Sequence, residues 1–217
     1  MSKDTTPPAQ AHKPHMAQGK RLLMEAATRL AARQSSAQGV SLRELAREAG
    51  LNHNTFYRHF DSLDDMLGDI VDTFSQQLRE GLRQARQGAP SVDAITQNVV
   101  GWVLDFALLH RDVFIVAMRE RFGPPGPLRH AVHTMLQQLQ DDMLLELNAR
   151  QALPPLPEAT LRPVLRIIID QVFTMCFEHI ENPQDRAQRL LAAKAMFDTL
   201  LMGAVARHHL APARDGS

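Results

Sequence analysis

The stretch Ser41–Phe60, SLRELAREAGLNHNTFYRHF, contains two short amphipathic segments on either side of a glycine. Ser41 and Glu44 have the spacing of a capping box, in which each side chain bonds to the other residue's backbone N–H. Small and apolar residues then recur at the helical spacing i, i+3, i+4 and i+7, namely Leu42, Leu45, Ala46 and Ala49. The first half of the stretch is therefore predicted to be a helix with one apolar face.

Gly50 and Asn52 predict the end of this helix and the start of a second one. Glycine accepts the left-handed backbone that closes many helices, and asparagine is a favoured N-cap. In the second helix Phe56 and Phe60 lie one turn apart on the inner side, which leaves polar groups on the outer side and flanks. These groups belong to His53, Asn54, Thr55, Tyr57, Arg58 and His59.

Two helices around a glycine turn, with amide, guanidinium, hydroxyl and imidazole groups outside, indicate a DNA-binding helix-turn-helix. Asn54 and Arg58 point straight outward and are expected to contact base edges. The full set of predicted DNA contacts is Lys20, Ser41, Arg43, Asn52, His53, Asn54, Thr55, Tyr57, Arg58 and His59. The alternative is a helical hairpin whose polar side meets only water, and the combination of cap, turn and packing residues disfavours it.

The charge of the chain is divided unevenly. Residues 1–60 contain nine basic and four acidic residues, and residues 61–217 contain 15 basic and 20 acidic ones, so charges of +5 and −5 cancel. Affinity for phosphates is therefore expected in the N-terminal part.

The rest of the chain has helical periodicity and no strand-like alternation, so the predicted fold is all-α with about nine helices. Residues 1–17 are expected to be a flexible arm, 18–62 a three-helix DNA-binding domain that begins with a helix from Lys20 to Arg33, 63–210 a larger helical domain, and 211–217 a flexible tail. Glycine and proline clusters separate the helices of the larger domain. These helices are expected near 62–86, 95–106, 111–122, 128–151, 158–180 and 183–209.

The segment from about Gly19 to Phe74 resembles the tetracycline-repressor (TetR) family of bacterial transcription regulators. The resemblance rests on Ser41–Ala46, Ala49–Leu51 and Thr55–Phe60. It implies a regulator, most simply a repressor, whose helical body binds a small-molecule effector. The family often has a lysine near the start of the next helix to contact a phosphate, whereas this chain has Ser62-Leu63-Asp64-Asp65.

The resemblance also implies a homodimer formed by the last two helices. The first of them, from Glu158 to about Ile180, has an apolar band that is wider than one stripe and needs two packing partners. The second half of the interface is expected from Leu190, Phe197, Leu200, Leu201, Ala204 and Val205. A dimer suits a palindromic operator, because one helix-turn-helix covers only a half-site. The alternative is that both helices belong to the core of a monomer.

The stretch Phe114–Gly123, together with Ser41–Glu44 and Phe56–Phe60, resembles the FabR-like branch of the family, which represses unsaturated fatty-acid synthesis. That branch implies an acyl-CoA or acyl-carrier-protein thioester as effector, either as an inducer or as a co-repressor. Candidate ligand-binding residues are Trp102, Phe106, Phe114, Met118, Arg119, Val172, Phe173 and Cys176. The alternative for each apolar one is simple core packing, and Arg119 with Glu120 forms either a polar pair at the pocket or an ordinary ion pair.

Enzymatic motifs are missing from the sequence: it has no phosphate-cradling glycine loop, no nucleophile elbow and no cysteine cluster. We therefore expect no enzyme activity, no cofactor and no metal, although His130 and His133 have a helical spacing that a metal could use. The lone Cys176 lies in an apolar run and is expected to be a buried, inert thiol. No apolar run is long enough to span a membrane, so a cytoplasmic location is expected. The second-ranked function is an all-α lipid-binding or scaffold protein with a degenerate helix-turn-helix.

Overall fold

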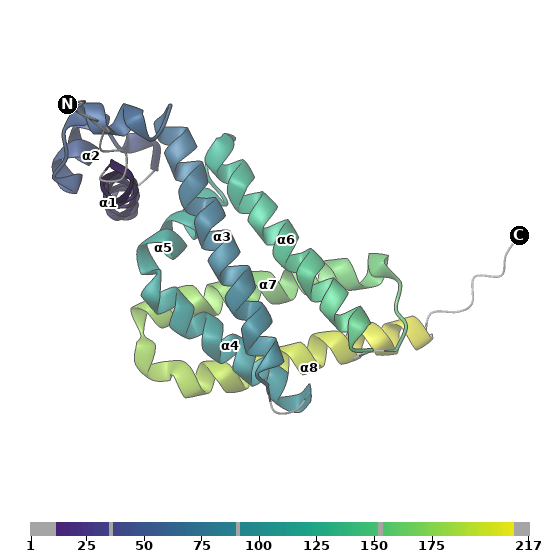
Figure 1. Cartoon of the computed structure of the whole chain (residues 1–217). Helices are drawn as coiled ribbons and strands as arrows, with labels where there is room; N and C mark the ends of the chain where they lie inside the picture. The colour runs from purple at the N-terminus through teal and green to yellow at the C-terminus, as the bar shows by residue number, and fades with distance from the viewer. Residues whose placement is uncertain (1–11, 35–36, 90–91, 152–153, 211–217) are drawn as a thin grey trace, which may run out of the picture.

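Helices account for all regular secondary structure in the part of the chain that the structure describes, which comprises residues 12–34, 37–89, 92–151 and 154–210 of a computed structural model (Figure 1). The all-α prediction is confirmed. The elements are α1 His12–Arg33, η1 Ala37–Gly39, α2 Leu42–Ala49, η2 His53–Arg58, α3 Leu63–Gln87, α4 Val92–Leu109, α5 Arg111–Glu120, α6 Pro127–Ala149, α7 Glu158–Glu181, η3 Pro183–Asp185 and α8 Arg186–Leu210, where η denotes a 3-10 helix.

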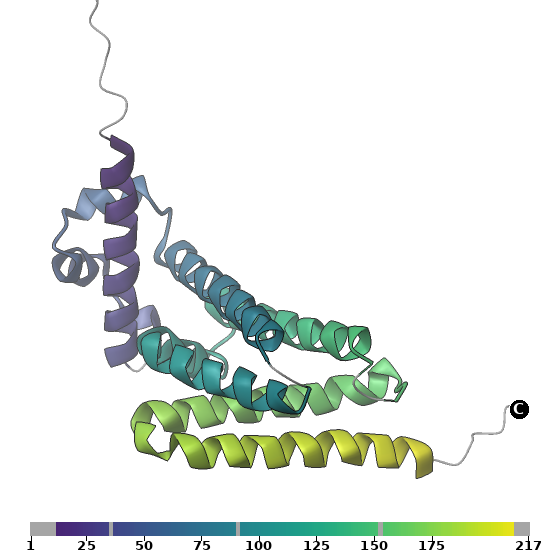
Figure 2. The same cartoon turned by 60° about the horizontal axis from the view of Figure 1, so that its bottom comes forward.

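The helices form a small N-terminal head and a larger body. The head contains α1, η1, α2 and η2, and α3 leads from it along the body (Figure 1). Helices α7 and α8 run antiparallel and side by side at the edge of the body (Figure 2). Among the described helices, none combines the length and the hydropathy that crossing a bilayer requires.

Helix α3 begins and packs as its sequence predicts. The Ser62 hydroxyl accepts a hydrogen bond from the Asp65 backbone N–H at 3.0 Å, which caps the helix. Asp64 and Asp65 place negative charge in the first turn, at the positive end of the helix dipole. The buried face consists of Met66, Leu67, Ile70, Val71, Phe74, Ser75, Leu78 and Gly81.

Helices α1 and α8 begin at residues other than those the sequence predicts. Helix α1 begins at His12 rather than at Lys20, so residues 12–17 are helical although the sequence predicts a flexible arm there. Pro14 does not prevent this, because proline is tolerated in the first turn of a helix. Helix α8 begins at Arg186, after the 3-10 turn η3 that Pro183 starts. Residues 1–11 of the predicted arm and the predicted tail 211–217 lie outside the described residues.

A close crossing joins α3 to α4. A Cβ atom placed on Gly81 would lie only 1.8 Å from Cζ2 of Trp102, so the indole rests directly against the backbone of α3. The Trp102 indole also stacks on Phe106, with ring centroids 4.8 Å apart and planes 24° apart. Trp102 therefore fills the space between two helices of the body.

Candidate nucleic-acid interface and ligand cavity

Helix α2 has the predicted capping box. The Glu44 backbone N–H donates to the Ser41 hydroxyl at 3.2 Å, and the Ser41 backbone N–H donates to the Glu44 carboxylate at 3.4 Å. Gly50 follows the helix in the left-handed conformation, with φ of 64°, and its N–H bonds back to the last turn. Leu45 and Ala46 are buried against the head, so α2 is fixed at both ends and along one face.

The second helix of the motif is shorter and tighter than predicted. Asn52 caps it by accepting a hydrogen bond from the Asn54 backbone N–H at 2.9 Å, but residues 53–58 form the 3-10 helix η2 and not an α-helix. Phe56 and Phe60 are both buried with ring centroids 5.7 Å apart, as the inner-side prediction requires. Phe56 belongs to this six-residue helix and Phe60 to the segment after it, and both rings are buried in the head.

The 3-10 geometry changes which groups lie together on the outside. With three residues per turn, side chains at i and i+3 lie above one another. Asn54 therefore shares a face with Tyr57, for which the sequence predicts a place on a flank. Asn54 and Arg58 are exposed, and Tyr57 is 58% exposed although it is aromatic.

Within the motif, the acidic residue Glu48 pairs with arginines of α1 and not with Arg43 or Arg58. Glu48 turns toward α1, where its carboxylate pairs with Arg29 at 3.0 Å and with Arg33 at 3.7 Å. Arg43 and Arg58 are exposed and form no ion pair with any described residue. This face of the head therefore combines unpaired guanidinium groups with neutral hydrogen-bonding groups, as an interface with DNA phosphates and bases requires.

Lys20 and His59 lie where the motif meets α1 and α3. The Lys20 ammonium is 2.6 Å from the Asp69 carboxylate and 5.2 Å from the centroid of the Phe60 ring, so it holds the head against α3. His59 packs on Gly19, where an added Cβ would lie 3.1 Å from its Nε2. Burial, with the charges of Lys20 and Arg58, lowers the pKa of His59 below its ordinary value. These surroundings favour the neutral form of the imidazole.

The ten predicted DNA contacts thus have distinct positions. Ser41 and Asn52 cap helices, Lys20 pairs with Asp69, and Thr55 and His59 are half-buried. The exposed remainder is Arg43, His53, Asn54, Tyr57 and Arg58. All ten stay predictions as DNA contacts.

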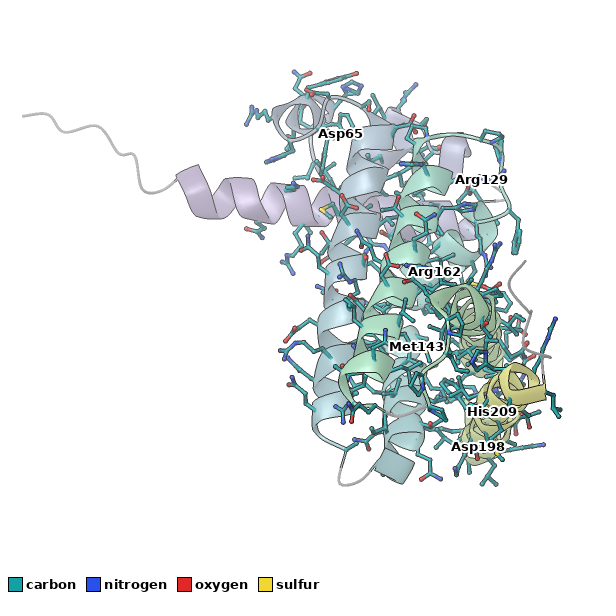
Figure 3. All side chains as sticks on the ribbon, turned by 90° about the vertical axis from the view of Figure 1, so that its right-hand side faces the viewer. Asp65, Arg129, Met143, Arg162, Asp198 and His209 are labelled. Carbon is teal, nitrogen blue, oxygen red and sulfur yellow. The ribbon has the colours of Figure 1, made fainter. Side chains whose placement is uncertain are left out.

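The body contains a cavity of about 670 Å³ between α3, α4, α6, α7 and α8. Met143 of α6 and Asp198 of α8 both line it, and Figure 3 shows these two residues on their helices. The apolar lining includes Leu78, Leu82, Ile95, Val99, Val100, Val103, Leu139, Leu147, Ile168, Ile169, Val172, Phe173, Phe197, Leu201, Met202 and Val205.

Only two of the predicted ligand-binding residues, Val172 and Phe173, line this cavity. The cavity lining does not include Trp102, Phe106, Phe114, Met118, Arg119 or Cys176. Phe114 and Cys176 are completely buried, and Phe114 stacks on Phe173 with ring centroids 5.1 Å apart. Burial raises the pKa of the Cys176 thiol, which keeps it protonated. These six residues stay predictions as ligand contacts, and none of them lines this cavity, because helices with wide apolar bands give no sign of which side borders a cavity.

Arg119 and Glu120 lie at the junction of body and head and not at the cavity. The Arg119 guanidinium donates to the Gln34 carbonyl at 2.5 Å, and the Glu120 carboxylate accepts from the Ala37 backbone N–H at 3.0 Å. The two side chains also pair with each other at 3.2 Å. Since Glu120 is only 4% exposed, this pair is a buried polar link between α5 and the end of α1.

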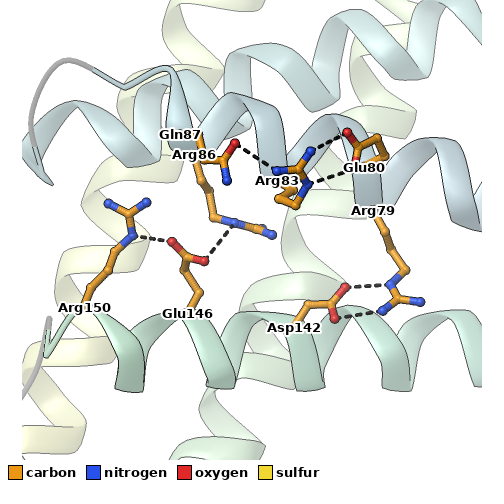
Figure 4. A network of polar contacts seen from close by, with 8 residues as sticks. All are labelled: Arg79, Glu80, Arg83, Arg86, Gln87, Asp142, Glu146 and Arg150. Carbon is orange, nitrogen blue, oxygen red and sulfur yellow. Dashed lines mark hydrogen bonds and ion pairs between the residues drawn. The ribbon is translucent and has the colours of Figure 1, made fainter.

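Sequence reasoning missed the charged part of the cavity lining, which consists of Arg86, Glu146, Arg150, Lys194 and Asp198. Figure 4 shows that several of these belong to a network between α3 and α6, with Glu146 between Arg86 and Arg150 and with Asp142 opposite Arg79. A signal was present in the sequence: basic residues at 79, 83 and 86 and acidic residues at 142 and 146 repeat at helical spacing on two helices.

Two family models match this chain. The model for bacterial regulatory proteins of the tetR family matches residues 23–70, which include the helix-turn-helix. The model for the tetracyclin repressor-like C-terminal domain matches residues 92–203, which include most of the body. The chain belongs to the TetR family. It is therefore a TetR-type transcriptional regulator, and its relatives are regulators and not enzymes.

Solved structures share the TetR fold over nearly their whole length. The fatty acid degradation regulator FadR from Bacillus halodurans is 16% identical, with a TM-score of 0.66 over 93% of this chain and 98% of that one. FadR from Bacillus subtilis, solved in complex with stearoyl-CoA, is 15% identical, with a TM-score of 0.64 over 84% and 97%. A transcriptional regulator from Rhodococcus sp. Rha1 is 17% identical, with a TM-score of 0.66 over 85% and 96%. At these identities the likeness is one of fold.

Proposed function

We propose that this TetR regulator binds a palindromic DNA operator as a homodimer and that a fatty acyl effector, an acyl-CoA or another acyl thioester, controls the binding. The observation that carries the DNA-binding part is the outer face of η2. There Asn54, Tyr57 and Arg58 are exposed while Phe56 and Phe60 hold the helix in the head. Operator DNA in bacteria lies in the cytoplasm, so the proposed DNA binding implies a cytoplasmic location.

The outward side of α7 and α8 supports the homodimer. It exposes large apolar side chains: Ile167 is 52% exposed, Phe177 36% and Leu191 66%. Large exposed apolar side chains are typical of protein interfaces, and a two-fold dimer places two helix-turn-helix motifs on the two halves of a palindrome. Of the residues expected at this interface on α8, Phe197 and Ala204 are buried and Leu201 and Val205 line the cavity, while Leu190 and Leu200 are half-buried.

The cavity supports an apolar effector. Its volume lies in the range of roughly 300–1,000 Å³ that is usual for small-molecule sites, and most of its lining is aliphatic or aromatic. The fold neighbour from B. subtilis was solved with stearoyl-CoA, and the stretch Phe114–Gly123 resembles FabR-like regulators. Together they favour a fatty acyl chain as the occupant.

Helix α3 provides the physical route from effector to operator. Leu78 and Leu82 of α3 line the cavity, and the start of the same helix follows directly from the motif in the head. A ligand that fits one position of α3 better than another shifts the population of dimers between two spacings of the recognition helices. The sign of the response depends on which spacing fits the operator.

Selection from random-sequence DNA tests the DNA-binding proposal, because it needs no operator sequence in advance. We expect enrichment of sites with two-fold symmetry, and a mobility shift on these sites that weakens steeply with salt. The alternative, a lipid-binding or scaffold protein with a degenerate motif, predicts that no sequence is enriched whether or not acyl ligands are present. That result would overturn the regulator proposal for this chain.

A thermal-shift series tests the effector proposal separately. The protein is melted with acyl-CoAs of increasing length and unsaturation, and with the same fatty acids uncoupled from CoA. Binding to the folded state raises the melting temperature by an amount that grows with affinity and concentration, so a graded rise with chain length is expected. Flat melting temperatures across the series would remove the acyl effector and leave the DNA-binding proposal intact.

A further inference from the structure

We infer that the cavity ligand carries an anionic group that lies against the guanidinium of Arg86. This inference rests on the proposed effector site and specifies its chemistry. The ligand class is an amphiphile with one anionic head and an apolar chain. The head is recognised by Arg86 at the end of α3, and the chain lies among residues such as Val103, Ile168 and Phe173.

Arg86 is a cation in an apolar wall. It lines the cavity on the same helix as Leu78 and Leu82, and its side chain is only 14% exposed. Its Nε is buried and has no hydrogen-bond partner among the described residues. Burial also lowers the pKa of Arg86, although a guanidinium keeps its proton in proteins. A buried cation with an unused donor is unfavourable unless a partner completes its hydrogen bonds.

The carboxylates near Arg86 are engaged elsewhere. Glu146 approaches Arg86 with 3.8 Å between Oε2 and Nε, which is too long for a hydrogen bond, while its other oxygen accepts from Arg150 (Figure 4). Asp142 forms a two-pronged pair with Arg79, at 2.6 and 2.9 Å. Arg86 therefore shares one carboxylate with Arg150 and has none of its own.

The charge balance of the cavity lining gives the same result. The lining contains three cations, Arg86, Arg150 and Lys194, and two carboxylates, Glu146 and Asp198. Lys194 and Asp198 pair with each other at 2.9 Å. The remaining excess of one positive charge is complementary to a ligand with an anionic group, and a planar guanidinium suits a carboxylate or a phosphate.

Two sources could supply this anionic group, the carboxylate of a free fatty acid and a phosphate of a CoA thioester. The experiment measures binding of dodecanoate, dodecanoyl-CoA and methyl dodecanoate by calorimetry. The proteins are wild type, Arg86→Gln and the matched control Arg83→Gln. Arg83 lies on the same helix but is exposed and pairs with Glu80 at 2.6 Å. All variants are checked for unchanged binding to selected DNA sites.

Arg86→Gln is expected to weaken binding of the anionic ligands by about tenfold or more, as for a lost charge-assisted hydrogen bond. Binding of the methyl ester should change little, and Arg83→Gln should behave like wild type. Loss for dodecanoate identifies the carboxylate as the recognised group, and loss for dodecanoyl-CoA alone identifies a phosphate. If Arg86→Gln does not fold, Arg86→Lys keeps the charge without the planar fork and should give an intermediate loss.

Two other outcomes would overturn the inference, and they differ in what they leave standing. If wild type and Arg86→Gln bind each of the three ligands with the same affinity, a role for Arg86 is refuted and the proposal of an acyl effector is kept. No binding of any of the three by wild type would contradict the acyl effector itself, and the inference about its head group would fail with it.

Discussion

Asn54 and Tyr57 lie one turn apart on a 3-10 helix, and Arg58 follows at the next step around it. Asn54→Ala and Arg58→Ala should each reduce discrimination between the selected operator and random DNA by about 1–3 kcal/mol, because amide and guanidinium groups bond to base edges. Tyr57→Phe and His59→Ala, as expected phosphate contacts, should weaken binding to both DNAs alike. Mobility shifts on the two DNAs measure this. Equal losses on both DNAs for all four variants would show that another face of the head contacts the bases.

Individual site residues were predictable only where a backbone rule fixed them. The capping roles of Ser41 and Asn52 and the left-handed Gly50 follow from local sequence, and the structure has them. The cavity residues follow from how five helices pack, which no local pattern encodes. Phe114 and Phe173 have similar apolar surroundings in the sequence, yet only Phe173 borders the cavity.

The crossing of α3 and α4 depends on the absence of a side chain at Gly81. Gly81→Ala would place a methyl group within 1.8 Å of the Trp102 ring, so the helices or the indole must move. We expect a loss of about 1–3 kcal/mol in the free energy of unfolding, as for overpacked cores. Gly68→Ala, on the same helix with nothing within 4 Å, is the matched control and should gain up to about 1 kcal/mol. Urea unfolding of both variants measures the difference, and two equal effects would contradict this description of the crossing.

The polar link that Arg119 and Glu120 form between α5 and the head should also contribute to stability. Glu120→Ala leaves the Ala37 N–H without its acceptor and should cost about 1–3 kcal/mol locally. Faster amide hydrogen exchange is expected at residues 37–40. Glu25→Ala is the control, because Glu25 pairs with Arg21 on the surface, at 3.5 Å, and such pairs contribute little. Unchanged exchange at 37–40 in Glu120→Ala would show that the link does not hold the head.

Several helix ends could be predicted from the sequence. Breaks at Gly88, Gly123–Pro127 and Pro154–Pro157 predicted helix ends to within a few residues, because glycine and proline act locally. The 3-10 form of η2 was not predictable in this way. An α-helix and a 3-10 helix both accept the same cap and the same buried phenylalanines, and the packing of the head decides between them.

For the molecule as a whole, we expect three histidines to make the stability depend on pH. Burial is the main cause of a lowered pKa at His59, His110 and His179. The folded state therefore binds fewer protons than the unfolded chain, whose histidines titrate near about 6.5. The stabilisation from the neutral forms is present above this pH and is lost as the pH falls below it. The melting temperature should therefore decrease between about pH 7.5 and 5.5.

His179 is the residue that tests this most directly, because it is 1% exposed and neither ring nitrogen has a hydrogen-bond partner among the described residues. His179→Leu should make the melting temperature less sensitive to acid, since a group that resists protonation in the fold is removed. His208→Leu, at an exposed position of α8, is the control and should retain the wild-type pH profile. Identical profiles for wild type and His179→Leu would exclude His179 as a source of the acid sensitivity.

The Gly81–Trp102 contact also gives the protein an optical property. Trp102 is the single tryptophan of the chain, and its indole touches the backbone of the helix that runs from the cavity to the head. Indole emission depends on what surrounds the ring, so a slide or rotation of α3 against α4 changes the fluorescence of unlabelled protein. Under the proposed control of DNA binding by an effector, the wavelength of that emission is expected to follow the movement of α3 in real time.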